Sequence, residues 1–362
     1  MRLDSLWLTD FRNYTDATVD LAPDGLTVIT GANGEGKTNI LEAVGWLATL
    51  ASFRGAPAEA LVRVGAESAV VRGAGSRAGR ELLVEGSISP RGRTRVQVNR
   101  QPLRRSRDLL GALRVSVFSP DDLVLIKGGP AERRGYLDDL LVSCHPRWDT
   151  VRTDLDRVLR QRATLLKQAG GRLTAEVGLT LDVWDAQLAE LGTTLAEGRA
   201  ALVDQLEPQV AKAYEDVAGE PAAVTLSYAA PWRDTDGGLA AALAAARRDD
   251  LRRGVSTVGP HRDEIMIVLG GLPSRTHASQ GEQRSLALAL RLGGHQVVQQ
   301  AAQESPVLLL DDVFSELDPD RSAALLAHLP AGQALLTASG PLPAGVVPAR
   351  RLRVRAGVVV DD

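Results

Sequence analysis

Short apolar and polar runs alternate along the first hundred residues, as in strands that bury one face. Strands are expected at residues 3–9, 14–21 and 26–30, because polar residues and the turn formers Pro23 and Gly25 separate these runs. A helix is expected from Lys37 to about Leu50. Residues 69–100 predict further short strands, with a hairpin-like pair at 81–88 and 94–98. This part of the chain is therefore predicted to be mixed α/β.

The middle of the chain has a helical pattern. Apolar residues recur every three or four positions over 151–166 and again from Trp184 to Val217, and Gly170-Gly171 separates the two runs. The simplest interpretation is an antiparallel helical pair that forms an arm. A helix of ~40 residues would reach ~60 Å, and Pro208 is expected to bend it. The alternative is two helices packed on the main core.

Mixed α/β patterning returns after about residue 250. A strand is expected at 265–269, a long helix after Gly281, an apolar strand at 307–310, a helix from Pro319 and a strand at 334–336. This order predicts an α/β head made from both ends of the chain and interrupted by a helical arm. The expected boundaries are 1–125 for the first head lobe, 126–250 for the arm and 251–362 for the second head lobe.

Composition narrows the class of protein. The 362 residues are 44% hydrophobic and carry a net charge of −3, which by itself suggests neither a nucleic-acid binder nor a membrane binder. Cys144 is the single cysteine, and the start of the chain lacks the apolar core of a signal peptide. The apolar run at 239–246 is far shorter than the ~20 residues of a membrane span. A cytoplasmic protein without membrane segments is expected.

A phosphate-binding motif lies between the third strand and the first helix. Residues 31–38 match G-x-x-x-x-G-K-[ST] in the strand-to-helix context that this motif requires. In such a P-loop, backbone amides surround phosphate oxygens, Lys37 reaches the β- and γ-phosphates, and Thr38 binds Mg²⁺. A Gly-rich turn without function is the alternative. The predicted nucleotide-binding residues are Gly31, Ala32, Asn33, Gly34, Glu35, Gly36, Lys37 and Thr38.

Two carboxylates end the apolar strand at 307–310. A strand of this kind is buried in a parallel sheet and delivers residues to its C-terminal edge. Asp311 is expected to bind Mg²⁺, through water, and Asp312 to orient the water that attacks the γ-phosphate. The alternative is that both are turn and cap residues before Pro319.

A third motif precedes the long helix. Residues 279–284 read Ser-Gln-Gly-Glu-Gln-Arg and satisfy the S-x-x-E pattern of a capping box, so a purely structural role is open. The order of this turn, a helix, an apolar strand, two acids and then residues 315–318 resembles the signature, Walker B and D-loop run of the ABC superfamily. In that superfamily the signature faces a γ-phosphate bound by another head. Ser279, Gly281 and Asp318 are therefore candidate site residues, and ATP is expected to join two copies.

Further segments resemble the RecF family, bacterial DNA replication and repair proteins of the SMC-like branch. They are residues 8–14, 31–43, 118–123, 130–134, 258–264 and 310–318. The resemblance implies an ABC-type ATPase head with a short arm, binding of ATP and Mg²⁺, and ATP-dependent dimerisation. It also implies binding to duplex and gapped DNA, and cooperation with RecR and RecO in loading RecA at gaps.

The resemblance assigns roles to two polar turns. It places Arg12 and Asn13 beside adenosine, although a polar hairpin tip is the alternative. It places His261 and Arg262 near the nucleotide or the head interface, although they could form a lone polar turn. The signature departs from Ser-Gly-Gly-Gln, and Asp312 stands where most ABC ATPases have Glu. Because Asp is one methylene shorter, slow turnover below ~1 s⁻¹ is the hypothesis.

Charge is unevenly distributed along the chain. Residues 72–114 hold eleven arginines against three acids, a local balance of +8, and contain no aromatic residue. Such a stretch favours contact with duplex phosphates over stacking on single-stranded bases. A solvated arginine-rich surface is the alternative.

Two other functions share a P-loop. The runner-up is the nucleotide-binding subunit of an ABC transporter, although the predicted arm and the 248 residues from Gly31 to Ser279 argue against a compact transporter head. A small-molecule kinase would not need residues 279–283 or 315–318.

Overall fold

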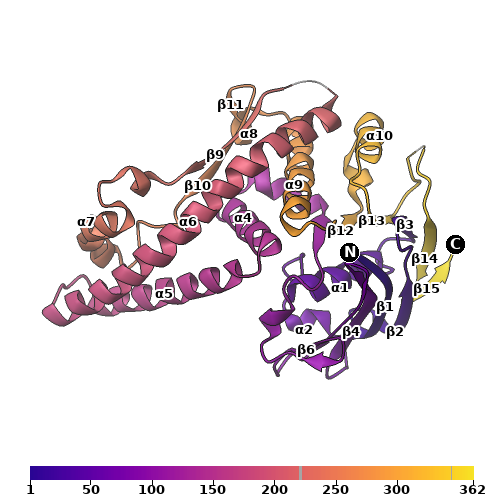
Figure 1. Cartoon of the computed structure of the whole chain (residues 1–362), viewed down its shortest axis with the longest axis horizontal. Coiled ribbons are helices and arrows are strands. Elements are labelled where there is room, and N and C mark those ends of the chain that lie inside the picture. The colour runs from indigo at the N-terminus through magenta and orange to yellow at the C-terminus, as the bar shows by residue number, and fades with distance from the viewer. Residues whose placement is uncertain (220–221, 344) are drawn as a thin grey trace. The chain divides into compact units, whose positions relative to one another are not determined.

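The computed structural model describes residues 1–219, 222–343 and 345–362. The chain divides into two compact units (Figure 1). The first unit comprises Met1–Leu123, Lys212–Pro221 and Arg284–Asp362, and the second comprises Val124–Ala211 and Ala222–Gln283. Both ends of the chain thus contribute to one unit, as the sequence predicts for the head.

An antiparallel sheet occupies the N-terminal part of the first unit. Its strand order is β2 (Tyr14–Asp20), β1 (Arg2–Phe11), β4 (Ala69–Arg77), β5 (Arg80–Ile88), β6 (Arg95–Val98) and β7 (Gln101–Pro102). β1 and β2 meet at Phe11 and Tyr14, so a two-residue turn joins them. The expected pairing of 81–88 with 94–98 is confirmed as β5 and β6.

A mostly parallel sheet combines strands from both ends of the chain. Its order is β15 (Val358–Asp361), β14 (Arg350–Arg355), β3 (Gly25–Thr30), β13 (Gln333–Ala338), β12 (Val307–Asp311) and β8 (Val115–Phe118). All neighbours are parallel except the edge pair β14–β15. Parallel strands carry their C-terminal ends to one edge, so the segments after β3, β12 and β13 lie together there.

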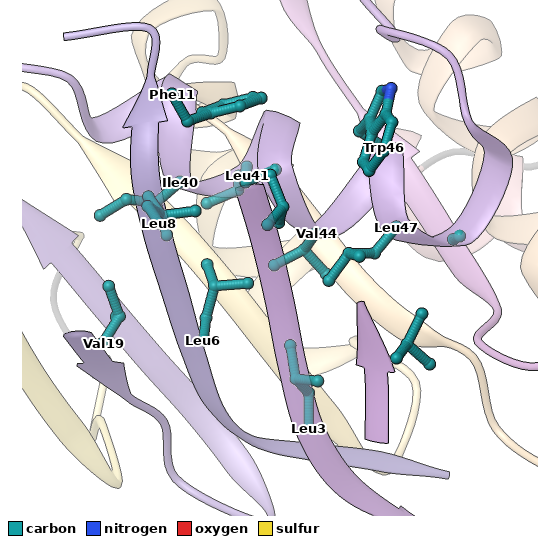
Figure 2. Close-up of a cluster of buried hydrophobic side chains, with 14 of the residues drawn as sticks. Leu3, Leu6, Leu8, Phe11, Val19, Ile40, Leu41, Val44, Trp46 and Leu47 are labelled. Atoms are coloured by element: carbon teal, nitrogen blue, oxygen red, sulfur yellow. The ribbon is translucent and has the colours of Figure 1, made fainter. Parts of the chain in front are cut away.

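Helix α1 (Lys37–Thr49) packs against both sheets of this unit. Residues 40–48 of this helix are all buried, and apart from Glu42 they are apolar or glycine. Figure 2 shows Ile40, Leu41 and Val44 beside Leu6 and Leu8 of β1. This core fixes the start of α1, and therefore the preceding loop, relative to both sheets.

Short helices and one long helix complete the first unit. They are α2 (Ala58–Leu61), η1 (Ser106–Leu109), η2 (Pro120–Leu123), η4 (Val313–Glu316), α10 (Pro319–Ala327) and α9 (Gln280–Ala302). The boundary between the units runs through the first turn of α9.

The second unit joins helices to a small antiparallel sheet. The sheet has the order β11 (Leu272–Pro273), β10 (Glu264–Leu269) and β9 (Val224–Ala229). The helices are α3 (Val124–Lys127), α4 (Pro130–Cys144), α5 (Trp148–Ala169), α6 (Ala175–Ala218, of which the part from Lys212 on groups with the first unit), η3 (Pro231–Asp234), α7 (Gly238–Arg253) and α8 (Ser274–His277). Among the described residues, no helix combines the length and apolar character that crossing a bilayer requires.

The expected antiparallel helical pair is confirmed as α5 and α6 (Figure 1). Leu166 and Leu181 share a buried cluster near the connection, whereas Trp148, at the far end of α5, lies against Gly198. Pro208, which is expected to bend this helix, lies inside α6, and α6 continues through it as one helix.

The structure places the boundary between the arm and the second head lobe differently from the sequence analysis. Residues 251–283 group with the arm rather than with the second head lobe, and the arm unit is therefore not all helical. The physical reason is strand pairing, because β10 pairs with β9 from Glu264–Ala229 to Leu269–Val224. The C-terminal hairpin β14–β15 was also absent from the predicted elements.

Candidate functional site

The P-loop lies at the C-terminal edge of the parallel sheet, between β3 and α1. The Lys37 ammonium spans the loop and donates to the carbonyls of Gly31 (2.8 Å) and Ala32 (2.9 Å). Ala32, Asn33 and Gly34 are exposed at the tip. The loop therefore presents its tip to solvent while its lysine is held along the inner side.

Two glycines of the loop have no room for a side chain. Both have positive φ, +151° at Gly31 and +113° at Gly36. A Cβ at Gly31 would lie 2.5 Å from the Val354 carbonyl oxygen, and one at Gly36 would lie 2.6 Å from the side chain of Asn13. The loop is thus pressed between β14 and the β1–β2 turn, which requires glycine at these positions.

Asn13 holds the loop from the β1–β2 turn. Its Nδ2 donates to the Glu35 carbonyl (2.8 Å), and its Oδ1 accepts from Asn39 Nδ2 (2.8 Å). The neighbouring Tyr14 hydroxyl donates to the Gly36 carbonyl (2.9 Å). The turn that the resemblance places beside adenosine is therefore built against the P-loop.

Arg12 reaches in the other direction, to α1. Its Nε and Nη2 donate to both carboxylate oxygens of the fully buried Glu42 (2.7 and 2.6 Å), and its Nη1 donates to the Ala60 carbonyl (2.8 Å). A bidentate pair of this kind satisfies a buried charge and fixes the planes of both groups. All three nitrogens of Arg12 thus have protein partners.

The C-terminal hairpin adds a contact that the sequence analysis missed. The Ala356 amide, in the turn between β14 and β15, donates to the Glu35 carboxylate. β14 pairs with β3 across more than 300 residues of sequence, so no local sequence pattern predicts this contact.

The predicted metal ligands meet at the sheet edge. Thr38 Oγ1 donates to Asp311 Oδ1 (2.7 Å), which joins the first turn of α1 to the end of β12. Thr337, on the neighbouring strand, donates to the same oxygen (2.7 Å) and accepts from the Asp312 amide (3.0 Å). Thr337 thus connects the two neighbouring acids that follow β12.

Asp312 begins the turn after β12 in a left-handed conformation, with φ of 46°. Its carboxylate accepts weakly from Ser339, from the amide at 3.4 Å and the hydroxyl at 3.2 Å. Ser339 follows β13 and was not among the predicted residues. The two acids therefore differ, because Asp311 is buried and doubly bonded whereas Asp312 is half-buried and loosely held.

Burial and charge act on the titrating groups here. Burial raises the pKa of Asp311, the hydrogen bonds from Thr337 and Thr38 oppose this shift, and the charge of Asp312 adds to it. Burial lowers the pKa of Lys37, and the nearby carboxylates of Asp312, Asp311 and Glu35 counteract that shift. A cation placed beside Asp311 would favour its ionised form.

This arrangement fits a nucleotide with Mg²⁺. A glycine loop at a helix N-terminus provides backbone donors for phosphate oxygens, and Lys37 adds a positive charge. Hydroxyl and carboxylate oxygens are the ligands that Mg²⁺ prefers, and the pair Thr38–Asp311 provides one of each.

Ser279 and Gly281 lie in the second unit, at the start of α9. The Ser279 amide donates to Glu282 Oε2 (2.6 Å), and the Glu282 amide donates to Ser279 Oγ (3.3 Å). The capping box that the sequence allowed is therefore formed. Asp318 also has a local partner, since its carboxylate accepts from the Arg321 amide (2.9 Å) and caps α10.

Comparisons with known proteins agree with this geometry. Residues 2–334 match the family described as the RecF/RecN/SMC N terminal domain. The chain is 47% identical to the DNA replication and repair protein RecF of Frankia alni, covering 94% of this chain and 93% of that protein. It is 45% identical to the RecF of Streptomyces avermitilis, covering 99% of each.

Solved structures show the same relationship. The structure of the recombination mediator protein RecF with ATP, in the RecFOR pathway, superposes with a TM-score of 0.90 at 29% identity, covering 100% of this chain and 97% of that one. An Smc head bound to the C-winged helix domain of ScpA shares the fold, with a TM-score of 0.59 at 16% identity and coverage of 99% and 96%. These relatives do not favour a transporter subunit. The chain belongs to the RecF family of DNA replication and repair proteins.

Proposed function

We propose that this protein is an ATP-dependent DNA-binding protein of replication and repair. In this proposal, ATP binding joins two copies on duplex or gapped DNA, and slow hydrolysis separates them. The dimer assists loading of RecA at gaps together with RecR and RecO. The observation that carries the proposal is the Thr38–Asp311 bond beside the P-loop, because it assembles a phosphate site and a metal site at one sheet edge.

Residues of the first unit have different roles in binding and hydrolysing the nucleotide. The P-loop amides and Lys37 bind the phosphates, while Thr38 and Asp311 hold Mg²⁺. The ion supplies neutralisation of phosphate charge when bound. Asp312 orients the attacking water and accepts its proton. Arg12 and Asn13 border the adenosine and, through Glu42 and Glu35, keep α1 and the loop in place.

Residues of the second unit complete the site of another copy. Ser279, Gly281 and the N-terminus of α9 are suited to bind an anion, since a helix start carries positive potential. Asp318 belongs to the same shared site. Each copy then holds half of two composite sites, which couples ATP binding to dimerisation.

The arginines of residues 72–114 provide a DNA surface in the first unit. Arg72 forms an ion pair with Glu85, and both Arg77 and Arg114 form ion pairs with Glu304. Other arginines of this stretch are exposed at the β4–β5 turn, in β6 and in the loops beside β6 and β7: Arg80, Arg91, Arg93, Arg95, Arg100, Arg104, Arg105 and Arg107. Such a surface binds phosphates without reading bases.

Hydrolysis of ATP by the purified protein, with and without duplex DNA, tests the proposal. We expect turnover below ~1 s⁻¹ that rises when DNA is added. The Lys37→Ala variant is the control for contaminating ATPases. A rate that DNA does not change, in a protein that binds ATP, would contradict the coupling of nucleotide to DNA.

A further inference from the structure

A loop in the second unit is held by buried cations. It comprises residues 256–263 and lies between α7 and β10. Arg162 of α5 donates to Ser256 Oγ (2.8 Å), and Arg199 of α6 donates to the Pro260 carbonyl (2.7 Å). Two arm helices thus fix the start and the middle of the loop.

Several donors converge on the Ser256 carbonyl. His261 Nε2 lies 3.1 Å from it, and Arg262 donates from Nε (3.2 Å) and Nη2 (3.0 Å). Because a carbonyl only accepts, His261 Nε2 carries a proton, and Nδ1 of the neutral ring is an acceptor. Nδ1 is buried and has no hydrogen-bond partner in the part of the chain that the structure describes.

Most arginines around this loop are neutralised by carboxylates. The bidentate or doubly bonded pairs are Arg199 with Asp138, Arg133 with Glu264, and Arg162 with Asp185 and Asp250. The remaining nearby acid, Asp263, accepts from the Tyr228 hydroxyl (2.6 Å) and the Trp232 indole (2.8 Å). The carboxylates of this region are therefore already engaged.

Two arginines remain without an ion pair. Arg134 donates from Nη1 to the Asp263 carbonyl (2.7 Å), and Arg262 donates only to the Ser256 carbonyl. Among the described residues, no carboxylate oxygen lies within 4.0 Å of either guanidinium. Arg262 is exposed and Arg134 is half-buried, so both guanidinium groups can be reached from solvent.

The surroundings of His261 indicate a positive local potential. Burial lowers the pKa of its imidazole, and the charges of Arg262, Arg134 and Arg162 lower it further. Guanidinium groups with open donors match the geometry of phosphate oxygens. Because hydrogen bonds to backbone carbonyls already orient both, little side-chain entropy is lost on binding a phosphate.

We propose that Arg134 and Arg262, which flank His261, form a phosphate-binding site whose ligand is a phosphodiester of the DNA backbone. The site rests on the proposed DNA-binding function and adds a second contact surface to the arginines of residues 72–114. It offers cations rather than a pattern matched to base edges, so its contribution is independent of sequence.

Fluorescence anisotropy with a short labelled duplex at several salt concentrations tests the site. For the double variant Arg134→Gln, Arg262→Gln, we expect the dissociation constant to rise about tenfold or more, as charged hydrogen bonds are lost. The slope of log affinity against log salt should fall by about 2, since each phosphate contact contributes roughly 0.9. Arg262→Lys should retain the slope. Arg157→Gln and Arg252→Gln change exposed arginines of the same unit that pair with Asp154 and Asp249, so they should behave as wild type.

The results of these titrations distinguish failure of the proposed phosphate site from failure of the proposed DNA-binding function. Arg262→Gln alone covers the risk that loss of Arg134 destabilises the unit, because Arg262 is exposed and bonds only one carbonyl. Wild-type affinity and slope in both Gln variants would overturn the site and leave the proposed function standing. A wild-type protein without salt-dependent DNA binding would overturn both. Weakened ATP binding with unchanged DNA binding would assign the site to a nucleotide phosphate and overturn the DNA assignment.

Discussion

Asp311 and Asp312 are adjacent carboxylates with different surroundings. Asp311 is buried and accepts from two threonine hydroxyls, whereas Asp312 lies in a left-handed turn and has only long contacts to Ser339. A metal ligand needs fixed geometry, while a group that orients water needs an open oxygen. The surroundings thus suit the two roles proposed for these residues.

Substitution of these residues separates binding from hydrolysis. Asp312→Asn retains the shape but cannot accept a proton, so we expect ATP affinity near wild type and hydrolysis slower by about 10²-fold or more. Lys37→Ala removes the cation of the P-loop and should abolish both. Nucleotide affinity by equilibrium dialysis and phosphate release by steady-state assay measure the two effects. Loss of ATP binding in Asp312→Asn would assign Asp312 to the binding site instead.

His295 of α9 predicts a pH-dependent stability. It is buried, its Nδ1 lies 3.0 Å from Ser116 Oγ, and burial lowers the pKa of the imidazole from 6.5 to about 4. Between these values the unfolded chain binds more protons than the folded one. Stability is therefore full above about pH 6.5 and falls as the pH drops toward 4, by up to about 3 kcal/mol.

Urea unfolding at several pH values checks this effect. The wild-type free energy of unfolding should decrease between pH 6.5 and 4 more steeply than that of His295→Gln, which cannot titrate there. His277→Gln serves as the control, because that histidine is exposed. Parallel pH profiles for wild type and His295→Gln would show that His295 does not change its protonation on unfolding.

At the scale of elements, the arginine stretch can be tested as a block. Arg104, Arg105 and Arg107 lie in or beside η1 and are exposed, so their reversal to Glu should leave the core intact. We expect duplex affinity to fall by about 10²-fold or more at low salt, because three phosphate contacts become repulsive. ATP affinity should not change. Anisotropy and dialysis measure the two, and unchanged DNA affinity would remove this surface from the proposal.

Periodicity and motif spacing predict those elements whose signal is local. The strands before the P-loop, α1, the α5–α6 pair and the acids after β12 all follow from short patterns in the chain. β14 and the assignment of residues 251–283 to the arm unit do not, because each depends on a strand partner distant in sequence. Ala356 enters the site through the β14–β3 pairing, which is why motif reasoning could not assign its contact.

At the scale of the whole molecule, the proposed hydrolysis of ATP uses residues from both units. The P-loop and both acids belong to the first unit, whereas Ser279 and Gly281 belong to the second. In the proposed dimer, each nucleotide is held by the first unit of one copy and the second unit of the other. Hydrolysis then requires two chains, although ATP binding requires only one.

This requirement gives a kinetic prediction for the intact protein. At low concentration the rate of hydrolysis per chain should rise with protein concentration, and it should level off once most chains are dimeric. Sedimentation velocity with ATP and Mg²⁺ at micromolar protein should show dimers, and Asp312→Asn should prolong them because its nucleotide persists. Ser279→Arg should retain ATP binding, since its own P-loop is intact, yet fail to dimerise because the added cation and bulk obstruct the start of α9. A rate per chain that is independent of concentration, together with monomers in the presence of ATP, would mean that each copy hydrolyses ATP alone.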